Sequence, residues 1–169
     1  MIKNIPLFNV TVILFACFAI GISCTNNNSV SLSKDQSATI ENEVRLMALH
    51  IADDLYKQGP IAWVTYFEKT PQFYMASGGM LAFPNNDSAT AFVKNILAKN
   101  IKNIQLTWND MRVDPLTPQL AGLAATYNEV LNGTDGKQIL ATGYFTAVAE
   151  KTAEGWQLRN LHWSIINGK

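Results

Sequence analysis

The sequence predicts an α+β domain in which three N-terminal helices pack in a strongly curved, mostly antiparallel sheet. Apolar residues first recur at three- and four-residue steps, as in amphipathic helices, and beyond about residue 100 the chain reads as a series of long strands. Helices and sheets each bury one face, so the economical arrangement is a sheet that bends around the helices. Such a cone leaves a pocket at its wide end.

Three helices are expected before the main sheet. Residues 39–57 place their apolar side chains on one helical face, and Gly59-Pro60 ends this helix. Pro60 suits the first turn of a short second helix that runs to Phe67. A third helix, capped by Asp87 or Ser88, keeps apolar spacing as far as Leu97.

The strands are expected as one hairpin followed by a meander. The hairpin joins residues 72–76 to residues 80–83 through Ser77-Gly78-Gly79, a composition typical of turns. Glycine, proline and asparagine separate the later strands. These four strands are predicted at residues 104–113, 119–131, 138–151 and 155–166.

The composition favours a folded body and argues against nucleic-acid binding. Hydrophobic residues make up 48% of the chain and charged residues 15%, whereas disordered chains combine low hydrophobicity with high charge. The 13 basic residues balance 13 acidic ones and form no cluster that could follow a phosphate backbone.

Residues 1–23 have the layout of a signal peptide. Lys3 supplies a positive charge, and the apolar run of residues 10–22 is shorter than the roughly 20 residues that span a bilayer, which leaves a transmembrane helix as the weaker alternative. Cys17 lies inside this leader. Cleavage after Ser23 therefore leaves Cys24 as the one cysteine of the mature chain.

The segment Ile20-Gly21-Ile22-Ser23-Cys24 resembles the lipobox of bacterial lipoproteins. This resemblance implies a diacylated Cys24 and a chain anchored to a membrane of the cell envelope. Residues 24–37, rich in Asn and Ser, are expected to be a flexible spacer, and residues 38–169 a single domain. We expect this domain to face the periplasm.

The closing segment Gly155-Trp156 through His162-Trp163-Ser164, together with residues 143–148, resembles SnoaL-like domains. These domains belong to the cystatin-like cone superfamily named after nuclear transport factor 2 and ketosteroid isomerase. Many relatives carry two histidines in this strand, but here the first position is Asn160. The resemblance implies a cone with a pocket. Because Asn160 replaces the first histidine of the pair, no metal site is expected, and no cofactor is expected either.

His162 is the candidate catalytic residue. Side chains alternate along a strand, so His162 is expected on one face with Asn160 and Ser164, where an imidazole could exchange a proton beside an amide and a hydroxyl. The alternative is a histidine held by a polar neighbour that only shapes the cavity wall.

Aromatic residues are candidates for the pocket wall, because apolar walls with a few polar tips are typical of small-molecule cavities. The alternative for each of them is an ordinary place in the core. These candidates are Trp63, Tyr66, Tyr74, Trp108 and Tyr127.

The sequence alone leaves three functions open. The first is a lipid-anchored pocket protein that binds a small apolar molecule. The second is an isomerase-like or cyclase-like enzyme in which His162 transfers a proton and a tyrosine stabilises an oxyanion. The third is an interaction module of the envelope, with a homodimer formed through the outer sheet face.

Overall fold

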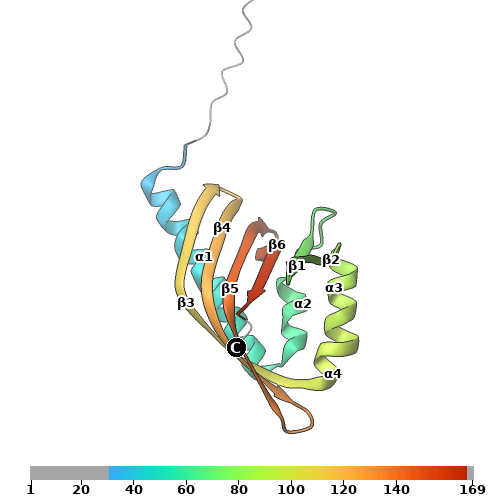
Figure 1. Ribbon diagram of the computed structural model, residues 1–169. Helices are drawn as coiled ribbons and strands as arrows, with labels where there is room; N and C mark the ends of the chain where they lie inside the picture. Colours follow the sequence, from blue (N-terminus) through green and yellow to red (C-terminus); the bar gives the residue numbers. More distant parts are fainter. Residues whose placement is uncertain (1–30, 167–169) are drawn as a thin grey trace, which may run out of the picture. The chain divides into compact units, whose positions relative to one another are not determined.

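The computed structural model describes residues 31–166 as one folded body (Figure 1). The predicted signal peptide and Cys24 lie outside the described residues. Within residues 31–166, no helix is long and apolar enough to cross a membrane.

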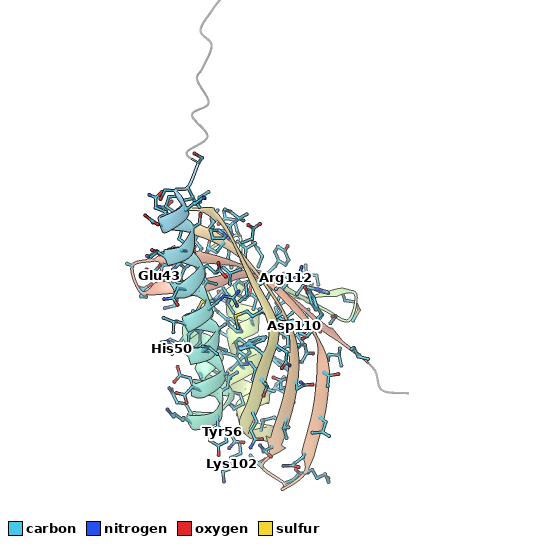
Figure 2. The ribbon with its side chains drawn as sticks, turned by 90° about the vertical axis from the view of Figure 1, so that its left-hand side faces the viewer. Glu43, His50, Tyr56, Lys102, Asp110 and Arg112 are labelled. Carbon is cyan, nitrogen blue, oxygen red and sulfur yellow. The ribbon has the colours of Figure 1, made fainter. Side chains whose placement is uncertain are left out.

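Helix α1, Lys34–Lys57, begins five residues before the predicted start. The reason is a capping box, in which the Ser33 hydroxyl accepts from the Gln36 backbone and the Gln36 side chain accepts from the Ser33 backbone. His50 and Tyr56 are exposed along this helix (Figure 2). Its buried face matches the predicted apolar stripe: Ile40, Val44, Met47, Ala48, Ile51 and Leu55.

The other helices are short. A 3₁₀ turn, Pro60–Ala62, leads into α2, Trp63–Tyr66. The predicted third helix is divided into α3, Asn86–Phe92, a π-helical turn η2, Val93–Leu97, and α4, Ala98–Asn100. A π turn widens a helix locally and is often found at functional sites.

Six strands form one sheet in the order β2-β1-β6-β5-β4-β3. The pairing is antiparallel except between β1 and β6, which run parallel. The curved, mostly antiparallel sheet wraps the helices, and the predicted fold class is confirmed (Figure 1). The strands are β1 Tyr74–Ser77, β2 Met80–Phe83, β3 Ile101–Thr117, β4 Leu120–Gly133, β5 Gln138–Thr152 and β6 Gly155–Ile165.

The strand register shifts at several places in this sheet, among them one in β3 and one in β6. In β3 the register shifts between Asn109 and Arg112, where Asp110 has a φ of 46°. In β6, Asn160 pairs with Val148 and Leu158 with Ala149, so that Arg159 is an extra residue on its strand. A bulge increases local twist and shifts the alternation of side chains by one position.

The outer face of the sheet has few charges at its centre. Outward positions carry no Asp, Glu, Lys or Arg on the described stretches 122–130 of β4, 140–148 of β5 and 160–164 of β6. Leu140 and Tyr144 are exposed there, with 75% and 43% of their surface accessible. The homodimer expected through this face stays a prediction.

Gly143 of β5 leaves room for the Tyr127 side chain, which extends from β4 past β5 to reach β6. Tyr127 of β4 lies opposite Gly143, and its hydroxyl donates to the Ser164 carbonyl of β6 at 3.1 Å. A Cβ at residue 143 would lie 1.8 Å from this carbonyl oxygen and 2.9 Å from the Tyr127 hydroxyl. The fully buried Tyr127 therefore depends on glycine at this position.

We expect Gly143→Ala to lower the free energy of unfolding by about 2 to 4 kcal/mol, because backbone and tyrosine must both move. Gly122→Ala in β4 is the matched control, since its Cβ would have no neighbour closer than 3.7 Å. Urea unfolding measures both. Equal stability of the two variants would contradict the close approach at Gly143.

Candidate functional site

A cavity of about 140 Å³ lies between the inner face of the sheet and the segment from β1 to η2. Its wall is almost entirely apolar, and one carboxylate interrupts it. The lining residues are Trp63, Phe67, Met75, Phe83, Ala89, Phe92, Val93, Leu97, Ile104, Glu129, Leu131, Leu161 and Trp163.

Aromatic contacts hold the cavity wall. Trp163 of β6 meets Trp63 of α2 edge to face, with ring centroids 5.6 Å apart. A second pair in the wall is Phe83 of β2 and Phe92 of α3, with ring centroids 5.1 Å apart. Because aromatic rings are rigid and present large surfaces, these pairs fix the wall.

The π turn η2 contributes the helical side of the wall. Val93 begins this turn and Leu97 ends it, and both line the cavity. Asn85 caps the helix that precedes the turn by accepting from the Ser88 backbone at 2.9 Å. The cap fixes where α3 starts, and therefore where the π turn faces the sheet.

Glu129 is the polar group of the cavity. It occupies an inward position of β4, with Leu106 of β3 and Ala141 of β5 as its partners across the sheet. The side chain is partly buried, and removal of the carboxyl from water raises its pKa to about 7. Near neutral pH this group can therefore either donate or accept a hydrogen bond.

Tyr127 lies two residues before Glu129 on the same face. Burial, followed by the nearby Glu129 charge, raises the pKa of its phenol to about 12. The phenol therefore keeps its proton at neutral pH and donates it to Ser164. Ala141 faces Glu129 from β5, and Gly143 faces Tyr127, whose hydroxyl and the Ser164 carbonyl occupy the space beside the glycine.

His162 does not point into this cavity. The bulge at Arg159 shifts the alternation of β6, so that Leu161 and Trp163 face inward and His162 is exposed on the outer face. The expectation that the imidazole projects into the pocket is wrong, because it assumed an unbroken period of two.

Asn160 and Ser164 are also outside the cavity wall. The Asn160 amide donates to the Gln72 carbonyl at 2.7 Å and so fastens β6 to the segment before β1. The Ser164 hydroxyl donates to the Tyr144 carbonyl at 3.0 Å on the outer face. The same bulge explains why neither side chain joins the pocket as predicted.

Of the predicted aromatic wall, Trp63 lines the cavity. Tyr74 is 45% exposed, and Tyr66 donates to an Asp54 carboxyl oxygen at 2.5 Å. Trp108 packs against the core and donates to the Ala48 carbonyl at 2.8 Å. Tyr127 lies in the core outside the cavity wall. Trp108 and Tyr127 therefore belong to the core, Tyr66 is partly buried, and Tyr74 is exposed.

Sequence reasoning missed Glu129 and Trp163. The signal for Glu129 was present, since it continues the inward series Leu123, Ala125 and Tyr127. At a strand position that faces the core, a carboxylate is rarely buried without a functional reason. Trp163 was missed because its inward direction depends on the bulge.

Within residues 31–166, no three His, Cys, Asp or Glu side chains are grouped closely enough to hold a metal ion. His50, Asp53 and Asp54 lie on α1, where Lys57 pairs with Asp53 at 2.7 Å and Tyr66 donates to Asp54. These α1 carboxylates have structural partners.

Comparison with known structures fits this architecture. One similar structure is a nuclear transport factor 2-like superfamily protein from Salmonella enterica subsp. enterica serovar Typhimurium str. LT2. It superimposes with a TM-score of 0.64 and 15% sequence identity, over 78% of this chain and 94% of that one. This chain has the nuclear transport factor 2-like fold. No family model matches it, and no curated protein matches its sequence.

Two further structures share the nuclear transport factor 2-like fold. The hexachlorocyclohexane dehydrochlorinase LinA-type3 from Novosphingobium barchaimii LL02 gives a TM-score of 0.62 at 10% identity, over 80% of this chain and 92% of that one. A conserved protein from Planctomyces limnophilus DSM 3776 gives 0.60 at 12% identity, over 73% and 94%. At such identities the likeness concerns the fold alone.

We expect Glu129→Gln to remove a pH-dependent loss of stability. Between the ordinary carboxyl pKa of 4.5 and about 7, the folded protein binds more protons at Glu129 than the unfolded chain, so its stability falls as pH rises through this window. The full rise in pKa corresponds to about 3 kcal/mol.

Urea unfolding at pH 5 and pH 8 measures this effect. From pH 5 to pH 8, Glu129→Gln should gain about 2 to 3 kcal/mol over the wild type. Glu154→Gln, at an exposed turn, should show no such gain. A pH-independent difference between Glu129→Gln and the wild type would mean that this carboxyl is not desolvated.

Proposed function

We propose that this chain is a lipid-anchored envelope protein whose cavity binds a small apolar molecule, with Glu129 as the polar contact. The observation that carries the proposal is an apolar cavity of about 140 Å³ in which Glu129 is the one desolvated carboxyl among the described lining residues. Binding sites characteristically combine an apolar wall with a few polar groups that orient the ligand. A dry cavity of about 150 Å³ can hold benzene, so the ligand has about one ring.

The binding proposal is tested by filling the cavity. Ala89 lines the cavity and is buried, whereas Ala91 on the same helix is exposed. We expect ring-sized compounds to bind the full chain in native mass spectrometry and to raise its melting temperature. Ala89→Leu should weaken binding at least tenfold and Ala91→Leu should not; equal binding by both variants would place the ligand elsewhere.

The anchor proposal is supported by the lipobox-like residues before Cys24 and by the short distance to the domain. Residues 25–33 separate Cys24 from α1 and span about 30 Å at full extension. A lipid on Cys24 would therefore keep the domain close to a membrane surface. The cavity would then meet molecules that enter or leave the bilayer.

We expect Cys24→Ser to abolish incorporation of labelled palmitate and to release the chain from the membrane fraction. One acyl-modified residue is removed, and with it the apolar chains that hold the protein to the bilayer. Cys17→Ser is the matched control and should keep both the label and the membrane association. Membrane retention of an unlabelled Cys24→Ser chain would favour an uncleaved transmembrane leader.

A second candidate function is proton transfer, with Glu129 in place of His162 as the acid or base. It is favoured by the Glu129 pKa of about 7, since a catalytic group works best when its pKa lies near the operating pH. The Tyr127 hydroxyl is already engaged with Ser164, so Glu129 would act without that phenol as donor.

Proton transfer is tested by hydrogen exchange at carbon. If Glu129 is a base, the wild type should exchange the α-hydrogens of cyclohexanone for deuterium, and Glu129→Gln should slow this at least about 100-fold. Glu68→Gln, outside the cavity, should exchange at the wild-type rate. A wild-type rate no higher than that of buffer alone would exclude this reaction.

A further inference from the structure

We propose that the cavity selects small cationic amines over neutral and anionic molecules of the same shape. The geometry points to this choice through one carboxylate in a wall that holds five aromatic side chains and, among the described residues, no positive side chain. The inference rests on the proposed binding function and adds the chemical class of the ligand.

The charge of the wall excludes one class and favours another. Among the residues that line the cavity in the described part of the chain, Glu129 is ionisable and none is Lys, Arg or His. A ligand carboxylate would lie beside a like charge with no counter-ion, whereas an ammonium group would gain an ion pair in a site of low dielectric. A neutral ligand gains one hydrogen bond at most from the same carboxyl.

The aromatic wall points the same way. Five of the lining side chains are aromatic: Trp63, Phe67, Phe83, Phe92 and Trp163. The faces of such rings carry negative potential and attract cations, with tryptophan the strongest, and cages of this kind recognise methylated amines. The ring centroids of the two tryptophans lie 5.6 Å apart in an edge-to-face arrangement, so the two ring planes have different orientations in the cavity wall.

The position of Glu129 suits a ligand with one apolar end and one charged end. The small Ala141 faces the carboxyl from β5, and the apolar cavity wall includes Leu131 and Ile104. The amine would lie against Glu129 and its ring or branched aliphatic group against the aromatic wall. The volume of about 140 Å³ limits this apolar group to about one ring.

Titration calorimetry with matched ligands tests this selectivity. The full chain in lipid nanodiscs is titrated with benzylamine, benzyl alcohol and benzoate at pH 7.5, with empty nanodiscs as the reference. We expect benzylamine to bind at least tenfold more tightly than benzyl alcohol, and benzoate at least tenfold more weakly than the alcohol.

Proton linkage gives a second readout. Below pH 7 an ammonium ligand must displace the Glu129 proton, so benzylamine binding at pH 6 should release close to one proton, measured as the dependence of the heat on the buffer. Benzyl alcohol should release none. From pH 7 to pH 6, the affinity for benzylamine should fall several-fold.

Variants assign the selectivity to the carboxyl. Glu129→Gln should abolish the amine preference, so that this variant binds benzylamine and benzyl alcohol with affinities within about threefold of each other. Glu68→Gln is the matched control, because burial also raises the pKa of Glu68, but Glu68 lies outside the cavity wall. It should leave the amine preference intact.

The outcomes separate the inference from the function on which it rests. Equal affinity for amine and alcohol, or a preference that survives Glu129→Gln, overturns the amine selectivity and leaves a binding pocket. Binding of none of the three ligands overturns both.

Discussion

One extra residue in β6, Arg159, decides which side chains of the closing strand face the helices. Beyond this bulge Trp163 points inward, where its ring lies 4.6 Å from Phe145 and 4.8 Å from Tyr127. The same ring meets Trp63 and forms part of the cavity wall. Aromatic packing in the core and the shape of the pocket therefore rest on a single departure from regular strand geometry.

Glu129 shows how the fold reserves a site within this core. Leu106 of β3 and Ala141 of β5 flank it in the sheet, and the other residues of the cavity wall are apolar. Holding a carboxyl there opposes folding above its raised pKa, and the surrounding hydrophobic burial offsets this cost. Sites that break a local rule while the rest of the fold compensates are typical of function.

The helices and the four long strands could be predicted because each follows a local pattern, as residues 138–152 illustrate. The parallel pairing of β1 with β6 could not, because the partner of a short strand is chosen by packing. Glu129 could have been found from the sequence, because the alternating pattern of β4 places it on the inward face. The direction of His162 could not, because the bulge depends on the register with β5.

The bulge also suggests how such a pocket changes during evolution. His162 and Trp163 are neighbours in sequence and lie on opposite faces. Loss of the extra residue upstream would exchange them and bring an imidazole to the inner face without any substitution at either position. A one-codon deletion could thus replace an aromatic wall with a titratable one. Insertions and deletions in the closing strand are therefore a route to new chemistry on an unchanged scaffold.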